Sequence, residues 1–116
     1  MNALWLTRLC AYKYSKHCAA TARQIIETKL QRQRVLLAAH KRRLMTPTVY
    51  AARTTEDLLL HEARFAKMYW REFGSLLPSS FNFSGRKPRV GDITNRLLDI
   101  GYHHLTNMVS ALLTQY

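Results

Sequence analysis

The sequence is poor in acidic residues, cysteines, glycines and prolines, and each shortage excludes a class of protein. Seven Asp and Glu stand against 18 Lys and Arg, which gives a net charge of +11 and excludes a neutral surface. The two cysteines, Cys10 and Cys18, form no CxxC pair, so a zinc knuckle or a disulfide framework is unsupported. Four glycines, three prolines and hardly any alternating apolar pattern favour helix over strand.

Long hydrophobic runs are missing as well. No stretch reaches the roughly 18 apolar residues that a membrane span needs, and the first residues lack the apolar core of a signal peptide. We therefore predict a cytoplasmic chain with no membrane partner. Its 116 residues are enough for one domain, or part of a larger one. The basic balance is typical of a surface that meets nucleic acid or anionic lipid.

Apolar residues at helical spacing predict an all-α helical bundle with one long basic loop. The expected helices span about 3–14, 19–43, 54–73 and 93–115. Pro47 ends the second helix, and a short helical turn at 49–53 leads into the third. Thr54 with Asp57, or Thr55, is a suitable N-cap for the third helix, and Asp92 for the fourth.

The helix predicted at 19–43 is apolar on one side and basic elsewhere. Its expected buried residues are Ala22, Ile25, Ile26, Lys29, Leu30, Leu36 and Leu37. Seven cations meet only one acid, Glu27; they are Arg23, Lys29, Arg32, Arg34, Lys41, Arg42 and Arg43. Two interpretations stay open: a solvated basic face, or a track for DNA phosphates with Arg32 and Arg34 as candidate contacts.

The helix predicted at 54–73 carries a carboxylate within its apolar stripe. Around Glu62, the i−4, i−3, i+3 and i+4 neighbours are Leu58, Leu59, Phe65 and Ala66, and none of them is basic. Burying an ionised carboxylate costs several kcal/mol unless a cation or strong donors meet it. Glu62 is therefore expected to form an ion pair with a distant arginine, to lie at a partly exposed edge, or to act as a metal ligand or catalytic acid.

An irregular segment predicted at 78–92 combines serine, glycine and proline with basic and aromatic side chains. Its cations are Arg86, Lys87 and Arg89. A loop of this length in a compact domain is usually functional or disordered. Phe81 and Phe83 either stack on exposed bases beside these cations, or anchor the loop to the core.

Separated segments of the chain together resemble a known family. HEARFAKMYW and, after the basic loop, NRLLDIGYHHL resemble the helical domain of CRISPR-associated protein one, the spacer-acquisition integrase and endonuclease. The segment ARQIIETKLQRQRVLL resembles the long basic helix that comes first in that family. The likeness covers about Ala19 to Leu113. It implies a metal-dependent enzyme that inserts new spacers into CRISPR arrays, in defence against viruses.

The resemblance also implies roles for particular residues. Glu62 corresponds to the catalytic metal ligand of the family, for Mg or Mn. Tyr69 and Asn95 shape the site. The DNA-binding residues are Arg86, Lys87 and Arg89. Leu60 and Ala63 stand where the family often has glycine, which loosens the motif without removing its acid.

By the same resemblance, residues 1–116 are a partial integrase domain. The family's N-terminal β-rich domain, used for dimerisation, is expected ahead of this segment, and the remaining metal ligands, a histidine and acids, beyond it. Since a lone carboxylate binds Mg poorly, we expect weak or no catalysis from this chain alone. The full-length family members are expected to be homodimers that work with CRISPR-associated protein two.

A rival interpretation of the same residues is a small basic helical module that binds nucleic acid without catalysis. In it, Glu62 pairs with an arginine and has no metal. A third interpretation, a basic amphipathic peptide on a membrane surface, is disfavoured because the apolar stripes are long enough to form a mutual core.

Overall fold

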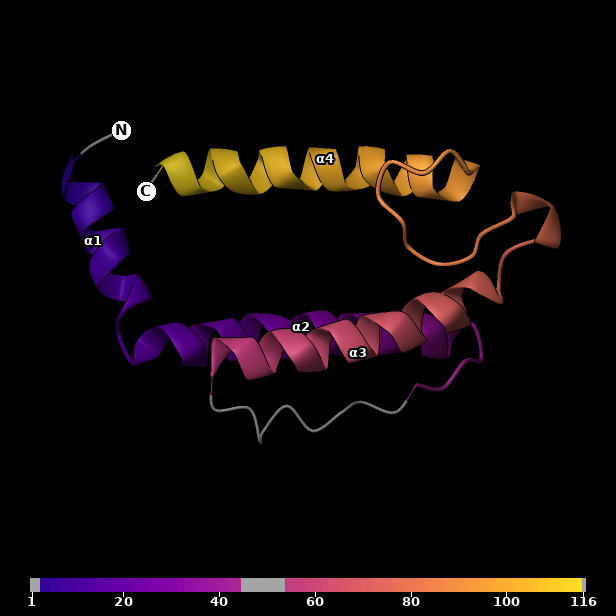
Figure 1. Ribbon diagram of the computed structural model, residues 1–116, viewed down its shortest axis with the longest axis horizontal. Coiled ribbons are helices and arrows are strands. Elements are labelled where there is room, and N and C mark those ends of the chain that lie inside the picture. Colours follow the sequence, from indigo (N-terminus) through magenta and orange to yellow (C-terminus); the bar gives the residue numbers. More distant parts are fainter. Residues whose placement is uncertain (1–2, 45–53, 116) are drawn as a thin grey trace. The chain divides into compact units, whose positions relative to one another are not determined.

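The computed structural model describes residues 3–44 and 54–115 of the chain. Its elements are α1 (Ala3–Lys13), α2 (His17–Ala39), α3 (Thr55–Gly74), a short 3₁₀ helix η2 (Ser79–Phe81) and α4 (Ile93–Gln115) (Figure 1). These two stretches contain no strand, so the all-α prediction is confirmed. The predicted break at Pro47 and the turn at 49–53 lie outside the described residues. The chain divides into two compact units, residues 1–69 and 70–116.

The core of the first unit lies between α2 and α3, which run side by side in the same direction (Figure 1). Its buried side chains are Leu30, Leu37, Leu58, Phe65 and Tyr69. On each helix two of these residues are seven positions apart, which is close to two turns, so each helix contributes a narrow stripe.

Several residues predicted to be buried, Lys29 among them, lie outside this stripe. Leu36 and Leu59 are 45% and 65% exposed, and Ile25 is 64% exposed. Each helical residue is rotated by about 100° from the one before it, so the neighbour of a buried leucine in sequence points to the side. The predicted apolar face was therefore too wide, although it was centred on the correct side of each helix.

The second helix ends four residues earlier than predicted. Lys41 adopts a left-handed backbone conformation with φ 60°. Its N–H donates to the carbonyl of Ala38 (3.0 Å), and the N–H of Arg42 donates to that of Leu37 (2.9 Å). This is the Schellman pattern of helix termination. Glycine usually marks such an end, so a lysine there left no signal in the sequence.

The third helix begins and ends within one residue of the predicted bounds, at Thr55 and Gly74 instead of 54 and 73. The hydroxyl of Thr54 accepts a hydrogen bond from the N–H of Asp57 (3.1 Å), which is the expected N-cap. Its last residue is Gly74. A Cβ built on Gly74 would lie 3.0 Å from the Phe83 ring, so glycine allows that ring to approach the helix closely without a shift.

In the second unit an aromatic cluster holds the irregular segment against the end of α3. The ring of Phe83 lies 6.2 Å from that of Trp70 and 5.9 Å from that of Phe73, edge to face in both cases. Phe83 therefore anchors the loop, as one of the two interpretations predicted, whereas Phe81 is 39% exposed.

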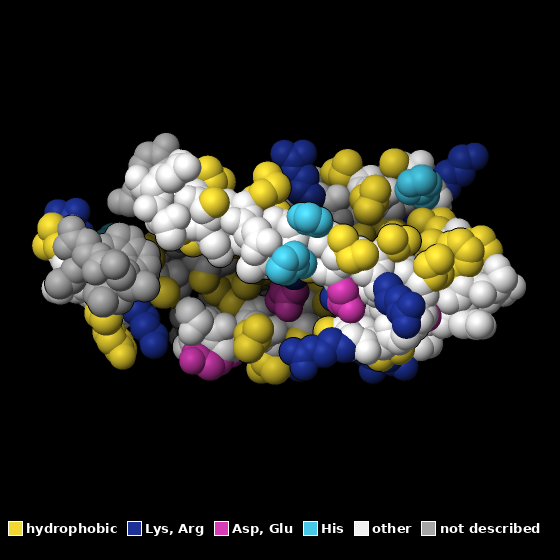
Figure 2. Space-filling view, turned by 90° about the horizontal axis from the view of Figure 1, so that it is seen from above, with side chains coloured by type: hydrophobic (Ala, Val, Ile, Leu, Met, Phe, Trp, Pro, Cys, Tyr) yellow, Lys and Arg dark blue, Asp and Glu magenta, His cyan; other side chains and the backbone are white. Residues whose placement is uncertain are grey.

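The fourth helix keeps the predicted N-cap, since Asp92 Oδ1 accepts a hydrogen bond from the N–H of Asn95 (2.9 Å). Many of its apolar side chains are exposed. Hydrophobic side chains are visible on the face of the molecule that Figure 2 shows. Leu97, Leu105, Met108, Val109 and Leu112 are all more than 40% exposed. None of the helices in residues 3–44 and 54–115 combines the length and apolar character needed to cross a membrane.

Candidate functional site

Glu62 meets a cation from the neighbouring helix. Its side chain on α3 is 20% exposed, and Oε1 accepts a hydrogen bond from Nζ of Lys29 on α2. The ion pair that the sequence left as one alternative is therefore present, with a lysine rather than an arginine. It joins the two helices beside their shared core, because Lys29 precedes the buried Leu30 and Glu62 lies between Leu58 and Phe65 on the buried stripe.

The surroundings of Glu62 do not by themselves fit a divalent ion. Across the described ranges, no three His, Cys, Asp or Glu side chains gather in a group able to hold a metal. Mg and Mn need several oxygen ligands, whereas Glu62 is a single carboxylate paired with an ammonium group. Tyr69 is buried two turns further along the same stripe of α3, at 5% exposure.

A second cluster forms around Asn95, near the start of α4. Asn95 is fully buried at 0% exposure. Its Oδ1 accepts from Nη1 of Arg86 (3.1 Å) and from the N–H of Lys87 (2.8 Å). Its Nδ2 donates to the carbonyl of Gly85 (3.0 Å) and to Oδ2 of Asp92 (2.7 Å). One amide side chain thus joins the basic loop to the helix.

Asp99, one turn further along α4, holds the same loop. Nη2 of Arg86 donates to its Oδ1 (2.6 Å), and the N–H of Arg89 donates to its Oδ2 (3.0 Å). The hydrogen bond from Arg86, followed by that from Arg89, holds the pKa of Asp99 below its ordinary value of 3.8. The guanidinium of Arg86 also lies over the Tyr102 ring, 5.1 Å from its centre.

The candidate DNA-binding residues occupy different environments. Arg86 is turned inward, with 15% of its side chain exposed, whereas Lys87 and Arg89 are exposed on the loop. Arg32 and Arg34 are exposed on α2 in the first unit. The structure thus brings Asn95 together with Arg86 and Lys87 in the second unit, whereas the two arginines of α2 belong to the first unit.

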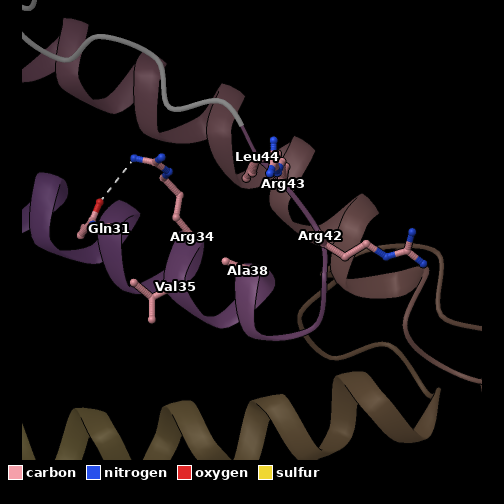
Figure 3. Close-up of a pocket in the computed structure, with 7 residues that line it drawn as sticks. All are labelled: Gln31, Arg34, Val35, Ala38, Arg42, Arg43 and Leu44. Atoms are coloured by element: carbon pink, nitrogen blue, oxygen red, sulfur yellow. Dashed lines mark hydrogen bonds between the residues drawn. The ribbon is translucent and has the colours of Figure 1, made fainter.

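Arg34 lines a pocket of about 490 Å³ at the end of α2 (Figure 3). The lining residues are Gln31, Arg34, Val35, Ala38, Arg42, Arg43 and Leu44. Arg34 extends toward Gln31, and its Nη1 lies 3.5 Å from the Gln31 Oε1; Arg42 extends away from both (Figure 3). The described residues that line this pocket include three arginines and no acid, so this part of it favours anions.

Two partner residues were missed by the sequence analysis, Lys29 as the cation for Glu62 and Asp99 as the anion for Arg86. Each had a signal. Lys29 was a charged residue on the expected buried side of its helix, as Glu62 was on its own. Asp99 follows Asn95 by four positions, so both lie on one face of α4.

The class that this fold and these surfaces define is a strongly basic, all-helical protein whose cations are distributed over its helices and its loop. The model of the family described as CRISPR associated protein Cas1 matches residues 2–116, and the chain belongs to that family.

The chain is also similar to a protein named CRISPR-associated endonuclease Cas1 1, from Saccharolobus solfataricus. The two are 34% identical over 120 residues, which cover 91% of this chain. They make up only 34% of the relative, so the chain spans about a third of its length. No solved structure matches the chain.

Proposed function

We propose that this chain is the part of a Cas1 enzyme that contributes one acidic ligand and a DNA-binding surface to spacer acquisition in CRISPR arrays. The family match over residues 2–116, which includes Glu62 on α3, carries the proposal. The reaction class is cleavage and transfer of phosphodiester bonds in DNA. DNA as substrate agrees with the net charge of +11.

In this proposal Glu62 offers a carboxylate oxygen to Mg or Mn, and the other ligands come from outside these 116 residues. Such an ion would stabilise negative charge on phosphate oxygens during the reaction. In the structure, the positive charge beside Glu62 comes from Lys29. With only one carboxylate at this position, the chain by itself is proposed to have weak or no activity.

The whole enzyme is further proposed to be a homodimer that works with CRISPR-associated protein two. Both properties come from the family resemblance. The surfaces available for DNA in this segment are the loop with Lys87 and Arg89, and the basic helix with Arg32 and Arg34.

A chimera tests the catalytic part of the proposal. This chain replaces the matching third of the Saccharolobus solfataricus relative, and DNA cleavage is measured with added Mg or Mn. We expect the chimera to cleave. Glu62→Gln should lower the rate by about a hundredfold or more, because even outer-shell partners of a metal contribute about 10- to 100-fold.

Glu72→Gln is the matched control. Glu72 lies on the same helix and also forms an ion pair, with Arg71. Its variant removes the same charge from the same helix and should keep activity within about twofold, because surface ion pairs contribute little. Equal activity of the Glu62 and Glu72 variants, in folded chimeras, would overturn the metal-ligand role of Glu62.

A second function, a basic helical module that binds nucleic acid without catalysis, is favoured by one observation, the ion pair of Glu62 with Lys29. Mn²⁺ titration of the 116-residue chain separates the two. In the module, Glu62→Gln changes neither Mn²⁺ nor DNA binding. In the enzyme segment, weak Mn²⁺ binding is present and is lost in that variant.

A further inference from the structure

The side chain of Asn95 has no hydrogen-bonding capacity left over. An amide offers two donor hydrogens and two acceptor lone pairs, and all four are used here by Arg86, Lys87, Gly85 and Asp92. Rotating the amide would turn its NH₂ group toward two donors, so only one orientation satisfies the site. A buried group satisfied in this way holds the loop in one conformation.

Arg86 is occupied in the same cluster. Its guanidinium donates to Asn95 and Asp99 and covers the ring of Tyr102, and its charge is met by the Asp99 carboxylate. Moving this side chain out to a phosphate would leave the buried Asn95 oxygen short of a donor and would separate a charge-assisted pair. Arg86 is therefore poorly suited to be a DNA contact.

Three cations that adjoin the cluster in sequence lie on the surface. Lys87 and Arg89 on the loop and Arg96 on α4 are exposed. Arg89 has φ 63°, an uncommon conformation for a residue with a side chain, and its N–H is held there by Asp99. The strained backbone is thus maintained by the same acid that neutralises Arg86.

We infer that Arg86, Asn95 and Asp99 are positioning residues, and that they present Lys87, Arg89 and Arg96 to the phosphates of DNA. The inference rests on the proposed function and changes one part of it, because Arg86 orders the loop instead of contacting DNA. Asp99, a negative residue, thereby strengthens the binding of a negative ligand.

Removing the charge of Asp99 gives the sharpest test. Binding of the 116-residue chain to a fluorescently labelled DNA duplex is followed by anisotropy, for the wild type, Asp99→Asn and Glu56→Gln. Each variant removes one negative charge, which by itself favours DNA binding. We expect Glu56→Gln to bind as well as the wild type or better, and Asp99→Asn to bind roughly fivefold more weakly because the loop loses a charge-assisted hydrogen bond.

Hydrogen exchange measures the order of the loop directly, through the protection of its backbone amides. The N–H groups of Lys87 and Arg89 donate to Asn95 and Asp99. We expect their exchange to be slow in the wild type, and that of the Arg89 amide to be fast in Asp99→Asn. Tighter DNA binding by Asp99→Asn, or an Arg89 amide that stays protected in it, would overturn the inference.

Arg86→Lys covers the case in which Asp99→Asn does not fold, as judged by circular dichroism. Lysine keeps the charge but lacks the fork that reaches two acceptors at once. Weaker binding supports a positioning role, and wild-type binding contradicts it. Separately, Lys87→Gln, Arg89→Gln and Arg96→Gln should each reduce the slope of log affinity against log salt by about one.

Failure of the proposed function has a different signature. A wild-type chain that shows no salt-dependent DNA binding contradicts the DNA-binding role of the whole segment, even if the loop amides are protected. Wild-type binding combined with undiminished binding of Asp99→Asn contradicts only the positioning role.

Discussion

At the scale of single residues, the ion pair between Lys29 and Glu62 is only partly removed from water. The exposed fractions of the two side chains are 45% and 20%. At such positions water screens the attraction and the ordered lysine loses rotamer freedom, so the net gain in stability is small. The role of Glu62 can therefore be tested by mutation without unfolding the first unit.

A double-mutant cycle measures this coupling. Lys29→Met, Glu62→Gln and the double variant are unfolded in urea, and we expect a coupling energy below about 1 kcal/mol. A value above about 2 kcal/mol would show that the pair is desolvated and contributes as a buried ion pair does. In that case the loss of activity in Glu62→Gln would need correction for stability.

The sequence predicted that Glu62 needs a partner but did not identify it. Electrostatics alone required a cation or a metal near a carboxylate on an apolar stripe. Eighteen Lys and Arg were available, and helical spacing within α3 could not choose among them. Only the packing of α2 beside α3 selected Lys29.

At the scale of elements, the contact between the basic loop and α4 depends on two carboxylates. Hydrogen bonds from Arg86 to Asp99, and from Asn95 to Asp92, lower both pKa values below the ordinary 3.8. In the unfolded chain the pKa values return to 3.8. The carboxylates therefore stabilise the loop above about pH 4, and this contribution disappears as the pH falls through the lower folded values.

Acid titration checks this linkage. We expect the hydrogen-exchange protection of the Lys87 and Arg89 amides to hold at about pH 5 and to fall as the pH drops below the ordinary carboxyl pKa of 3.8. In Asp99→Asn the Arg89 amide should lack this pH dependence. Protection that persists unchanged to about pH 2 would contradict the contribution of the carboxylates.

Two glycines in helices are expected to respond in opposite ways to alanine. A Cβ on Gly101, in α4, would meet no atom of the described residues within 4 Å. Gly101→Ala should raise stability by up to about 1 kcal/mol through helix propensity. Gly74→Ala should lower it, because its Cβ would lie 3.0 Å from the Phe83 ring. Thermal unfolding measures both, and destabilisation by Gly101→Ala would contradict the open surroundings.

The ends of the helices show which structural features the local sequence can predict. The N-caps Thr54 and Asp92 were predicted because a side-chain oxygen next to the first turn is sufficient to form them. The end of α2 was not, because Lys41 takes the left-handed position that glycine normally marks. Because backbone groups make this cap, a residue other than glycine at the left-handed position leaves no side-chain signal.

At the scale of the whole molecule, the main features are the positive net charge and the helical structure. Glu62, Glu72 and Asp99 each form an ion pair with lysine or arginine. Most of the 18 Lys and Arg are exposed, so the net charge of +11 is carried mainly by cations on the surface. Both compact units present such cations, at the end of α2 in the first and beside α4 in the second. This distribution suits contact with DNA along more than one surface.

The sequence by itself determined the all-α class, the basic character, the family and the apolar axis of each core helix. The class, the charge and the apolar axes follow from composition and periodicity, which each segment carries locally, whereas the family follows from the resemblance of particular segments to known members. Tertiary structure alone decided that Lys29 meets Glu62, and that Arg86 is turned inward on Asn95 and Asp99 while Lys87 and Arg89 stay exposed. The physical reason is that the partner of a buried polar group is selected by packing between segments, and no single segment contains that information.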